Sequence, residues 1–270
     1  MSTDTDQLLD IAVAAAKAAG DCLMGYRGRL EASAIDEKAR NDLVTVADRA
    51  SEQLIVEHLR RHFPDHAIVA EEGSGQTADS PYRWFIDPLD GTTNFVRNIP
   101  AFCVSIALEY HRELLLGVVW EPVHRELFTA VKGRGASLNG RPIRVSEVSD
   151  FGRAFLATGF PHHSKRYLPL YVQSFADIYL KAAGARRIGS AALDLCYTAC
   201  GRFDGFWELG LHSWDIAAGS LIVQEAGGVV TDFRGGPAYL ESGFVAAGNP
   251  AIHRRLISIL STYFRRPDDG

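Results

Sequence analysis

Two carboxylates three residues apart are the part of the sequence with the clearest chemical potential. An apolar run that ends at Ile86 leads directly into Asp87, and Asp90 follows in the same segment. Pro88 fixes its own φ angle and therefore stiffens the turn between the two carboxylates. Carboxylate oxygens are ligands for hard divalent cations such as Mg²⁺. The pattern predicts a metal site where a strand ends.

The residues that follow Asp90, from Gly91 to Asn94, are small or carry hydroxyl and amide groups, which is typical of a helix start. Backbone N–H groups at a helix start bind phosphate, and the helix dipole favours the negative charge. A metal site beside such a phosphate cradle would suit metal-assisted phosphoryl chemistry. The same pattern is compatible with a strand–turn–helix junction in which the Asp residues only cap the helix.

Further carboxylates stand at comparable positions along the chain. Glu71 follows the apolar run 67–70, and Asp215 lies where an apolar helical pattern begins. Glu208 lies between a predicted strand and a helix start, where it could accept hydrogen bonds from a polyol or be a loop charge. Each alone is typical of a cap or a surface charge. Buried together they would repel and raise one another's pKa values, so a shared cation would suit them.

The bulk composition argues against several classes of function. The chain has 270 residues and a formal net charge of −5, which is unfavourable for non-specific binding to nucleic acid or membranes. The acidic N-terminus lacks the basic and apolar blocks of a signal peptide, and the apolar runs are short. We therefore expect a cytoplasmic protein with no membrane and no nucleic-acid partner.

Hydrophobic periodicity predicts the elements that must position these residues. In the first part of the chain it predicts helices over 7–27 and 48–62, with Asp48 as the cap of the second, and strands over 67–70, 84–86, 102–109, 114–120 and 126–131. In the second part it predicts strands over 155–158, 187–188, 203–207, 229–233 and 244–246, and helices over 166–181, 191–200, 216–226 and 250–263.

This order of elements indicates an α+β protein built from stacked helix and sheet layers. We expect an N-terminal α+β lobe over 1–150, which carries the metal and phosphate motif. A C-terminal α/β lobe over 151–270 would complete the metal and substrate site at the junction.

Several motifs resemble those of one known family. The segment Asp87-Pro-Leu-Asp-Gly-Thr-Thr-Asn-Phe95 resembles the first signature of the inositol monophosphatase family. The second signature is matched by Trp214-Asp-Ile-Ala-Ala-Gly219 followed by Glu225-Ala-Gly-Gly228. Further matches in chain order are Lys38, Asp42-Leu-Val-Thr with Asp48, Ala70-Glu-Glu72, Gly133-x-Gly-Ala136 with Leu138-Asn-Gly140, and Gly189-Ser-Ala-Ala-Leu-Asp194. The resemblance covers nearly the whole chain.

The resemblance implies a layered α-β-α-β-α sandwich, a homodimer and a lithium-sensitive phosphatase. The cofactor would be Mg²⁺, two or three ions per site, which Mn²⁺ could replace. The implied metal ligands are Glu71, Asp87, the carbonyl of Leu89, Asp90 and Asp215. The implied catalytic residues are Asp48, Thr92 and Glu71, with Asp48 and Thr92 orienting the attacking water. The implied substrate contacts are the amides of Gly91 and Thr92 for phosphate, and Ala191 and Glu208 for hydroxyl groups. Arg187, which lies near the family's substrate loops, is a further candidate for substrate binding. Lys38 matches a lysine near a mobile loop of the metal site.

The implied reaction is Mg²⁺-dependent hydrolysis of inositol monophosphate, or of a related polyol or sugar phosphate, by metal-activated water. Relatives in the same superfamily leave alternatives open, namely fructose-1,6-bisphosphatase, histidinol-phosphate phosphatase and 3′-phosphoadenosine phosphatase. Two basic patches, Arg186-Arg187 and residues 162–166, could hold a second phosphate or be solvated loops. A different class of function is a non-catalytic regulatory protein that has kept the fold.

Overall fold

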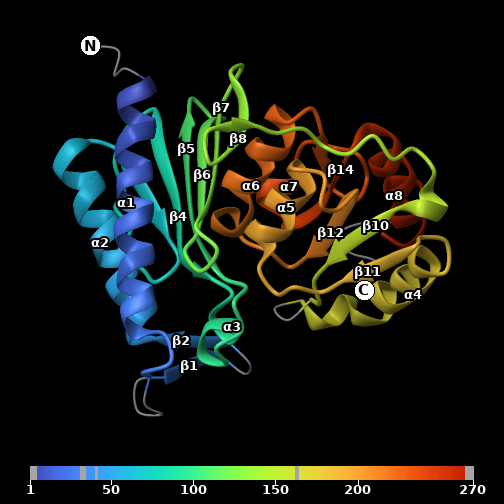
Figure 1. Ribbon diagram of the computed structural model, residues 1–270, viewed down its shortest axis with the longest axis horizontal. Coiled ribbons are helices and arrows are strands. Elements are labelled where there is room, and N and C mark those ends of the chain that lie inside the picture. The colour runs from blue at the N-terminus through green and yellow to red at the C-terminus, as the bar shows by residue number, and fades with distance from the viewer. Residues whose placement is uncertain (1–4, 31–34, 40–41, 162–163, 265–270) are drawn as a thin grey trace.

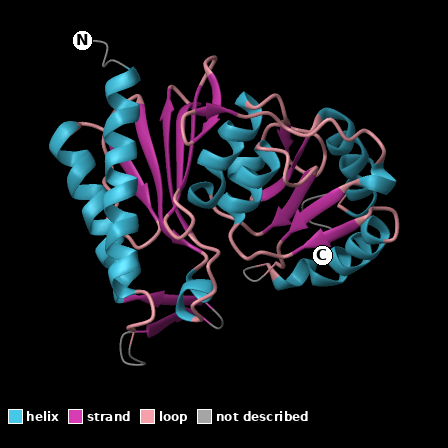
Figure 2. Cartoon of the chain, in the orientation of Figure 1, coloured by secondary structure: helices cyan, strands magenta, loops and turns pink. Residues whose placement is uncertain are grey.

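The computed structural model describes residues 5–30, 35–39, 42–161 and 164–264. Helix and sheet layers alternate through the molecule in the order α-β-α-β-α, as the resemblance implied (Figures 1 and 2). Helices α1 (Thr5–Tyr26) and α2 (Val46–His62) form one outer layer, and α4 (Leu168–Tyr179) and α8 (Pro250–Tyr263) form the other. Helices α5 (Ala191–Ala199) and α6 (Ser213–Glu225) lie between the two sheets.

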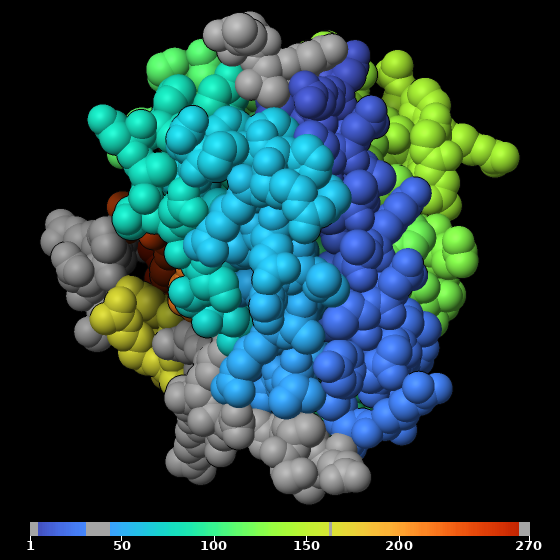
Figure 3. All heavy atoms as spheres, turned by 90° about the vertical axis from the view of Figure 1, so that its left-hand side faces the viewer, coloured from blue at the N-terminus to red at the C-terminus, as the bar shows by residue number. Residues whose placement is uncertain are grey.

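The first outer layer is a close pair of helices. Figure 3 looks onto this face, where α1 in dark blue lies beside α2 in lighter blue and cyan. The buried stripe of α1 is rich in alanine, including Ala12, Ala15, Ala16 and Ala19. Alanine favours helix and has no bulky side chain, so the backbones approach closely. This layer brings α2, which carries Asp48, against the sheet beneath it.

The larger sheet has the order β3-β4-β5-β6-β7-β8-β9. Its strands are β3 (Ala67–Ala70), β4 (Tyr82–Asp90), β5 (Cys103–Tyr110), β6 (Glu113–Glu121), β7 (Glu126–Val131), β8 (Gly135–Leu138) and β9 (Arg141–Pro142). β3 runs parallel to β4, and the remaining pairs are antiparallel. The register of β4 against β5 shifts between Asp87 and Asp90. Pro88 lies in this irregularity, which agrees with its lack of an N–H donor.

The smaller sheet has the order β11-β10-β12-β14-β13. Its strands are β10 (Phe155–Thr158), β11 (Gly184–Arg186), β12 (Gly205–Leu209), β13 (Val229–Thr231) and β14 (Phe244–Gly248). β10 pairs in parallel with β11 and β12, and β14 pairs antiparallel with β12 and β13. Short elements complete the described fold: the hairpin β1 (Ile35–Ala39) and β2 (Asp42–Thr45), and helices α3 (Thr92–Val96) and α7 (Tyr239–Ser242).

The middle helices join the two sheets through one apolar core. That core contains residues from both sides of residue 150, among them Phe85, Phe128, Leu195 and Ile222. A Cβ on Gly117 of β6 would lie only 2.8 Å from the carbonyl oxygen of Ala218, so glycine lets α6 lie directly on the sheet. The division into lobes at residue 150 stays a prediction, because the packing is continuous across it.

Most predicted elements are confirmed within two residues. β4 continues to Asp90, four residues past the predicted end at 86, and α6 begins at Ser213 rather than at 216. Two further details are wrong. The cap of α2 is Thr45, and Asp48 lies three residues later in a capping box. The strand predicted at 187–188 is instead β11 at Gly184–Arg186, because pairing with β10 stops there. No described helix combines the length and apolar character needed to cross a bilayer.

Candidate active site

A pocket of about 480 Å³ lies where the ends of both sheets meet the middle helices. It is lined by nearly all the residues that the sequence singled out: Glu71, Asp87, Leu89, Asp90, Gly91, Thr92, Arg187, Ala191, Glu208 and Asp215. Asp48 lies buried behind Thr92. Lys38 belongs to β1, but its side chain lies outside the described part of the chain.

The carboxylates of the pocket interact strongly with one another. Burial raises the pKa of Asp87 well above its usual range, and the charges of Glu71, Asp90 and Asp215 raise it further. Burial and the charge of Asp215 raise the pKa of Asp90 to about 7, against hydrogen bonds that lower it. A cation would relieve this repulsion and satisfy the buried oxygens.

Each of three pocket carboxylates uses one oxygen to bind the fold itself. Asp87 Oδ1 accepts the N–H of Leu89 at 3.0 Å. Asp90 Oδ2 accepts the hydroxyl of Ser190 and the N–H of Ala192, both at 2.7 Å. Asp215 Oδ2 accepts the N–H of His212 at 2.7 Å, which closes the capping box of α6. These bonds orient the carboxyl groups before any ligand arrives.

The donor set fits a hard divalent cation, because it consists of carboxylate oxygens and a backbone carbonyl. In the residues that the structure describes, no three His, Cys, Asp or Glu side chains are gathered tightly enough to hold an ion as they stand. Like-charged carboxylates repel one another, so full convergence is not expected from their own packing.

Thr92 and Asp48 form the hydrogen-bonded pair that the resemblance implied. The hydroxyl of Thr92 is 3.0 Å from Asp48 Oδ1 and 3.1 Å from the carbonyl oxygen of Leu89. Asp48 Oδ2 accepts the N–H of Thr45 at 2.8 Å and its hydroxyl at 2.6 Å. Burial raises the pKa of Asp48, while the hydrogen bonds from Thr45 and Thr92 lower it.

Gly91 shapes the turn between β4 and α3. Its φ angle is +100°, and a Cβ there would lie 2.8 Å from the carbonyl oxygen of Ala101, so both backbone and space require glycine. Asn94 in α3 links this turn to the segment before α5, because its Nδ2 donates to Ala101 O at 2.7 Å and to Ile188 O at 2.9 Å.

The second part of the chain contributes one buried acid, Glu208, and one exposed base, Arg187, to the pocket lining. Burial raises the pKa of Glu208 to about 8, the charge of Asp90 adds to this, and Arg187 opposes it. Gly159 lies directly beneath Glu208, since a Cβ at Gly159 would be 1.9 Å from Glu208 Oε1. Sequence reasoning missed Gly159, because no local pattern marks it.

The basic patches do not converge on this pocket. Among the cationic side chains that the structure describes, only Arg187 lines it. The guanidinium of Arg186 lies over the ring of Phe155 at 4.7 Å, and that of Arg166 lies over the ring of Tyr167 at 4.7 Å. His162 and His163 lie outside the described residues.

Ser190 is another site residue that sequence reasoning missed. It is the N-cap of α5, and its hydroxyl donates to Asp90 Oδ2 while lying 3.4 Å from the N–H of Leu193. A serine directly before an apolar helical run is a recognisable cap signal. That signal would have marked Ser190 as the start of α5, which is the helix that Asp90 of the first signature contacts.

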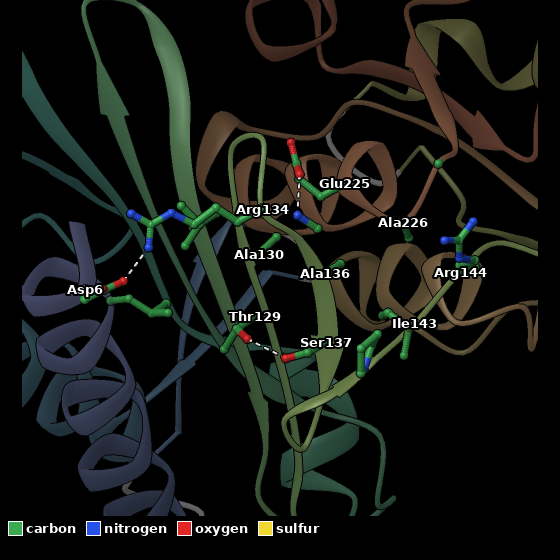
Figure 4. A pocket seen from close by; sticks show the side chains of 15 residues that line it. Asp6, Thr129, Ala130, Arg134, Ala136, Ser137, Ile143, Arg144, Glu225 and Ala226 are labelled. Carbon is green, nitrogen blue, oxygen red and sulfur yellow. Dashed lines mark hydrogen bonds and ion pairs between the residues drawn. The ribbon is translucent and has the colours of Figure 1, made fainter.

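A separate pocket of about 560 Å³ explains two of the other motifs (Figure 4). The carboxylate of Glu225 accepts the N–H groups of Gly133 and Gly135, both at 2.8 Å. Arg134, between these glycines, forms an ion pair with Asp6 of α1. Glu225 therefore joins α6 to the turn before β8, and none of the residues in this contact lines the candidate active-site pocket.

Comparison with known proteins places the chain in one family. The model of the inositol monophosphatase family matches residues 4–264. The Nus factor SuhB of Pseudomonas aeruginosa is 47% identical over 263 residues, which cover 95% of this chain and 96% of that protein. The Nus factor SuhB of Escherichia coli is 44% identical over 252 residues, which cover 93% and 94%.

Solved structures agree with this. The extragenic suppressor protein suhB of Bartonella henselae superimposes with a TM-score of 0.89 at 40% identity, covering 94% of this chain and 98% of that one. An inositol monophosphatase from Anabaena (Nostoc) superimposes with a TM-score of 0.85 at 43% identity, covering 95% and 96%. The chain belongs to the inositol monophosphatase family.

Proposed function

We propose that the protein hydrolyses a small phosphate monoester of a polyol or sugar, with inositol monophosphate as the leading substrate. The observation that supports this proposal is that four carboxylates, the Gly91 turn and Thr92 with its partner Asp48 all lie at one pocket. Carboxylates would bind the cation, the turn would bind the phosphate, and the hydroxyl pair would orient water.

Glu71, Asp87, Asp90, Asp215 and the carbonyl of Leu89 are the groups that would hold Mg²⁺. When bound, Mg²⁺ supplies Lewis acidity and neutralises charge on the phosphoryl oxygens. The proposal also includes two or three Mg²⁺ ions per site, inhibition by lithium, and Mn²⁺ as a replacement for Mg²⁺.

The protein's own contribution is positioning. The proton of the Thr92 hydroxyl points to Asp48 or to Leu89, which leaves the oxygen lone pairs to accept a hydrogen bond from a water molecule. Thr45 holds Asp48 in place from the opposite side. A water aligned in this way could attack phosphorus in line, and no protein nucleophile is required.

The substrate side favours a single phosphate on a hydroxylated carbon skeleton. Glu208 is placed to accept hydroxyl hydrogen bonds, and Ala191 lines the wall nearby. A bisphosphate would need a second cationic cluster, and Arg187 is the one described cation at the pocket. Monophosphates are therefore preferred over fructose-1,6-bisphosphate in this proposal.

Phosphate release tests the proposal directly. Inositol-1-phosphate, fructose-1,6-bisphosphate, histidinol phosphate and 3′-phosphoadenosine 5′-phosphate would be compared with Mg²⁺, each with and without lithium. The expected result is lithium-sensitive turnover, fastest with inositol-1-phosphate. Absence of turnover across the panel at saturating Mg²⁺ would contradict the phosphatase proposal.

A second candidate function rests on the relatives, whose name is Nus factor SuhB. Identity of 47% over nearly the whole chain supports a transcription-related role for this protein as well. That role would involve protein or nucleic-acid-associated partners, in contrast to the expectation from net charge. It would be compatible with catalysis, and a variant such as Asp90→Asn would separate the two, since it should lose hydrolysis and keep a partner-binding role.

The homodimer and the cytoplasmic location remain part of the proposal. The described surface offers an apolar stripe on α4, where Val172 and Tyr179 are each 52% exposed and Leu168 is 43% exposed. A second copy of the chain would cover this stripe. Light scattering should give twice the chain mass, and Val172→Glu should shift it toward the monomer.

A further inference from the structure

Helix α2 binds three separate segments of the candidate active site through neighbouring positions on one buried face. Asp48 accepts the hydroxyl of Thr92, and the hydroxyl of Ser51 donates to the carbonyl oxygen of Pro88 at 2.8 Å. Glu52 lies one helical turn after Asp48 and contacts the segment after β3. Residues three and four apart share a helix face, so one helix aligns these segments together.

Glu52 is fully buried, with 0% of its surface exposed, and its carboxylate has two backbone partners. Oε2 accepts the N–H of Glu72 at 2.6 Å, and Oε1 accepts the N–H of Ser74 at 2.8 Å. An ionised carboxylate only accepts hydrogen bonds, so it matches two converging N–H donors. No other standard side chain of this size offers two acceptor oxygens and no donor.

The segment held by Glu52 carries the metal-ligand candidate Glu71. On the sheet side, the N–H of Glu71 donates to Ile86 O at 3.2 Å. Farther on, Arg60 Nη2 donates to Ser74 O at 2.9 Å, but that contact is exposed. On the helix side, the buried carboxylate of Glu52 accepts the N–H of Glu72, which is the residue directly after Glu71.

We propose that Glu52 is a positioning residue that holds the segment 71–74 so that Glu71 faces Asp87 and Asp90. The proposal rests on the proposed metal-dependent function. Its physical basis is that a carboxylate ligand must be held in place before it can share a cation. Glu52 does not line the pocket, so it acts through Glu71 rather than on the substrate.

Glu52→Gln tests this with little change of size. The amide keeps one acceptor oxygen, but its NH₂ group would face the second backbone N–H and could not accept from it. The matched control is Glu57→Gln on the same helix, where Glu57 is exposed and contacts the side chain of Gln53. Mg²⁺ affinity would be measured by isothermal titration calorimetry for wild type and both variants.

Mutation of a residue that orients a metal ligand typically lowers metal affinity by about 10- to 100-fold. Glu52→Gln should therefore weaken Mg²⁺ binding by about tenfold or more. Glu57→Gln should bind as wild type. Raising Mg²⁺ should restore much of kcat in Glu52→Gln, because no group that touches the substrate has changed. If the variant unfolds, Glu52→Asp replaces it, since it keeps the charge and withdraws it by one methylene.

Hydrogen exchange provides a readout that does not depend on turnover. The amides of Glu72 and Ser74 should exchange faster in Glu52→Gln than in wild type, with the sheet amides unchanged. Wild-type Mg²⁺ affinity in the variant would overturn this inference alone. A wild-type protein that binds no Mg²⁺ would overturn the proposed function, and this inference with it.

Discussion

The carboxylate of Asp90, at the end of β4, accepts a hydrogen bond from the first turn of helix α5, where the N–H of Ala192 is 2.7 Å from Asp90 Oδ2. The same oxygen accepts the hydroxyl of Ser190 at 2.7 Å. Asp90 therefore links the first signature to a helix of the second part of the chain. The position of a metal-ligand candidate depends on how the two sheets pack around α5.

Asp90→Asn should abolish hydrolysis and leave the fold intact. The amide oxygen of asparagine can still accept from Ser190 and Ala192, but the charge that a divalent cation needs is lost. Phosphate release at saturating Mg²⁺ and the melting temperature would both be measured. Asp90→Ala should also lose the hydrogen bonds from Ser190 and Ala192, at a cost of about 1–3 kcal/mol in the free energy of unfolding, while Ser190 remains the N-cap of α5. Wild-type turnover by Asp90→Asn would show that this pocket is not the active site.

Thr92→Val should lower kcat by about 100-fold or more, with little change in melting temperature. Valine has nearly the same shape but cannot accept a hydrogen bond from water, and a misplacement of about 1 Å of a reacting group can cost about 10²-fold. Thr92→Ser keeps the hydroxyl and is the control, so it should retain most of the activity. Equal kcat for the valine and serine variants would exclude Thr92 from orienting water.

The site was predictable where chemistry and local pattern coincide. Asp87 and Asp90 follow an apolar strand, and strand ends meet at a common edge, so their gathering could be expected. Thr45 as the cap of α2 had a signal too, because a threonine three residues before Asp48 fits the capping-box pattern.

Other parts depend on packing between distant segments. Arg186 and Arg187 are adjacent in sequence, yet one lies over Phe155 and the other lines the pocket. β11 ends at Arg186, where its pairing with β10 stops, so Arg187 lies beyond the strand. Glu52 and Gly159 carry no local signal, since the groups that need them lie far along the chain. Tertiary contacts alone reveal such positions.

Gly159→Ala should change substrate preference without unfolding the protein. Its added methyl group would displace the Glu208 carboxylate, which is the end of a flexible side chain and can move. KM should rise for inositol-1-phosphate and stay unchanged for p-nitrophenyl phosphate, which has no vicinal hydroxyl groups. Glu208→Gln should show the same split, with kcat less affected than preference. Loss of activity on both esters in Glu208→Gln would give Glu208 a catalytic or structural role instead.

The metal-free protein should become less stable as pH rises from about 5 to 8, and Glu208 should account for part of this. Burial, with Asp90 and Asp215 nearby and Arg187 opposing, raises the pKa of Glu208 to about 8 from its ordinary value of 4.5. A raised folded-state pKa means that the folded protein binds the proton more tightly. Its stabilisation is complete below the unfolded pKa and is lost as pH rises through the folded pKa.

Urea unfolding in EDTA at pH 5, 6.5 and 8 would measure the effect for wild type and Glu208→Gln. Between the two pKa values the contribution of Glu208 can approach about 1.4 kcal/mol per pH unit. Wild type should therefore lose free energy of unfolding relative to Glu208→Gln as pH increases, because glutamine has no proton to release. Asp90, whose pKa is raised to about 7, interacts with Glu208, so repeating the comparison in an Asp90→Asn background isolates the contribution of Glu208. If the difference in the free energy of unfolding between the two proteins does not vary with pH, Glu208 is solvated and ionised throughout this pH range.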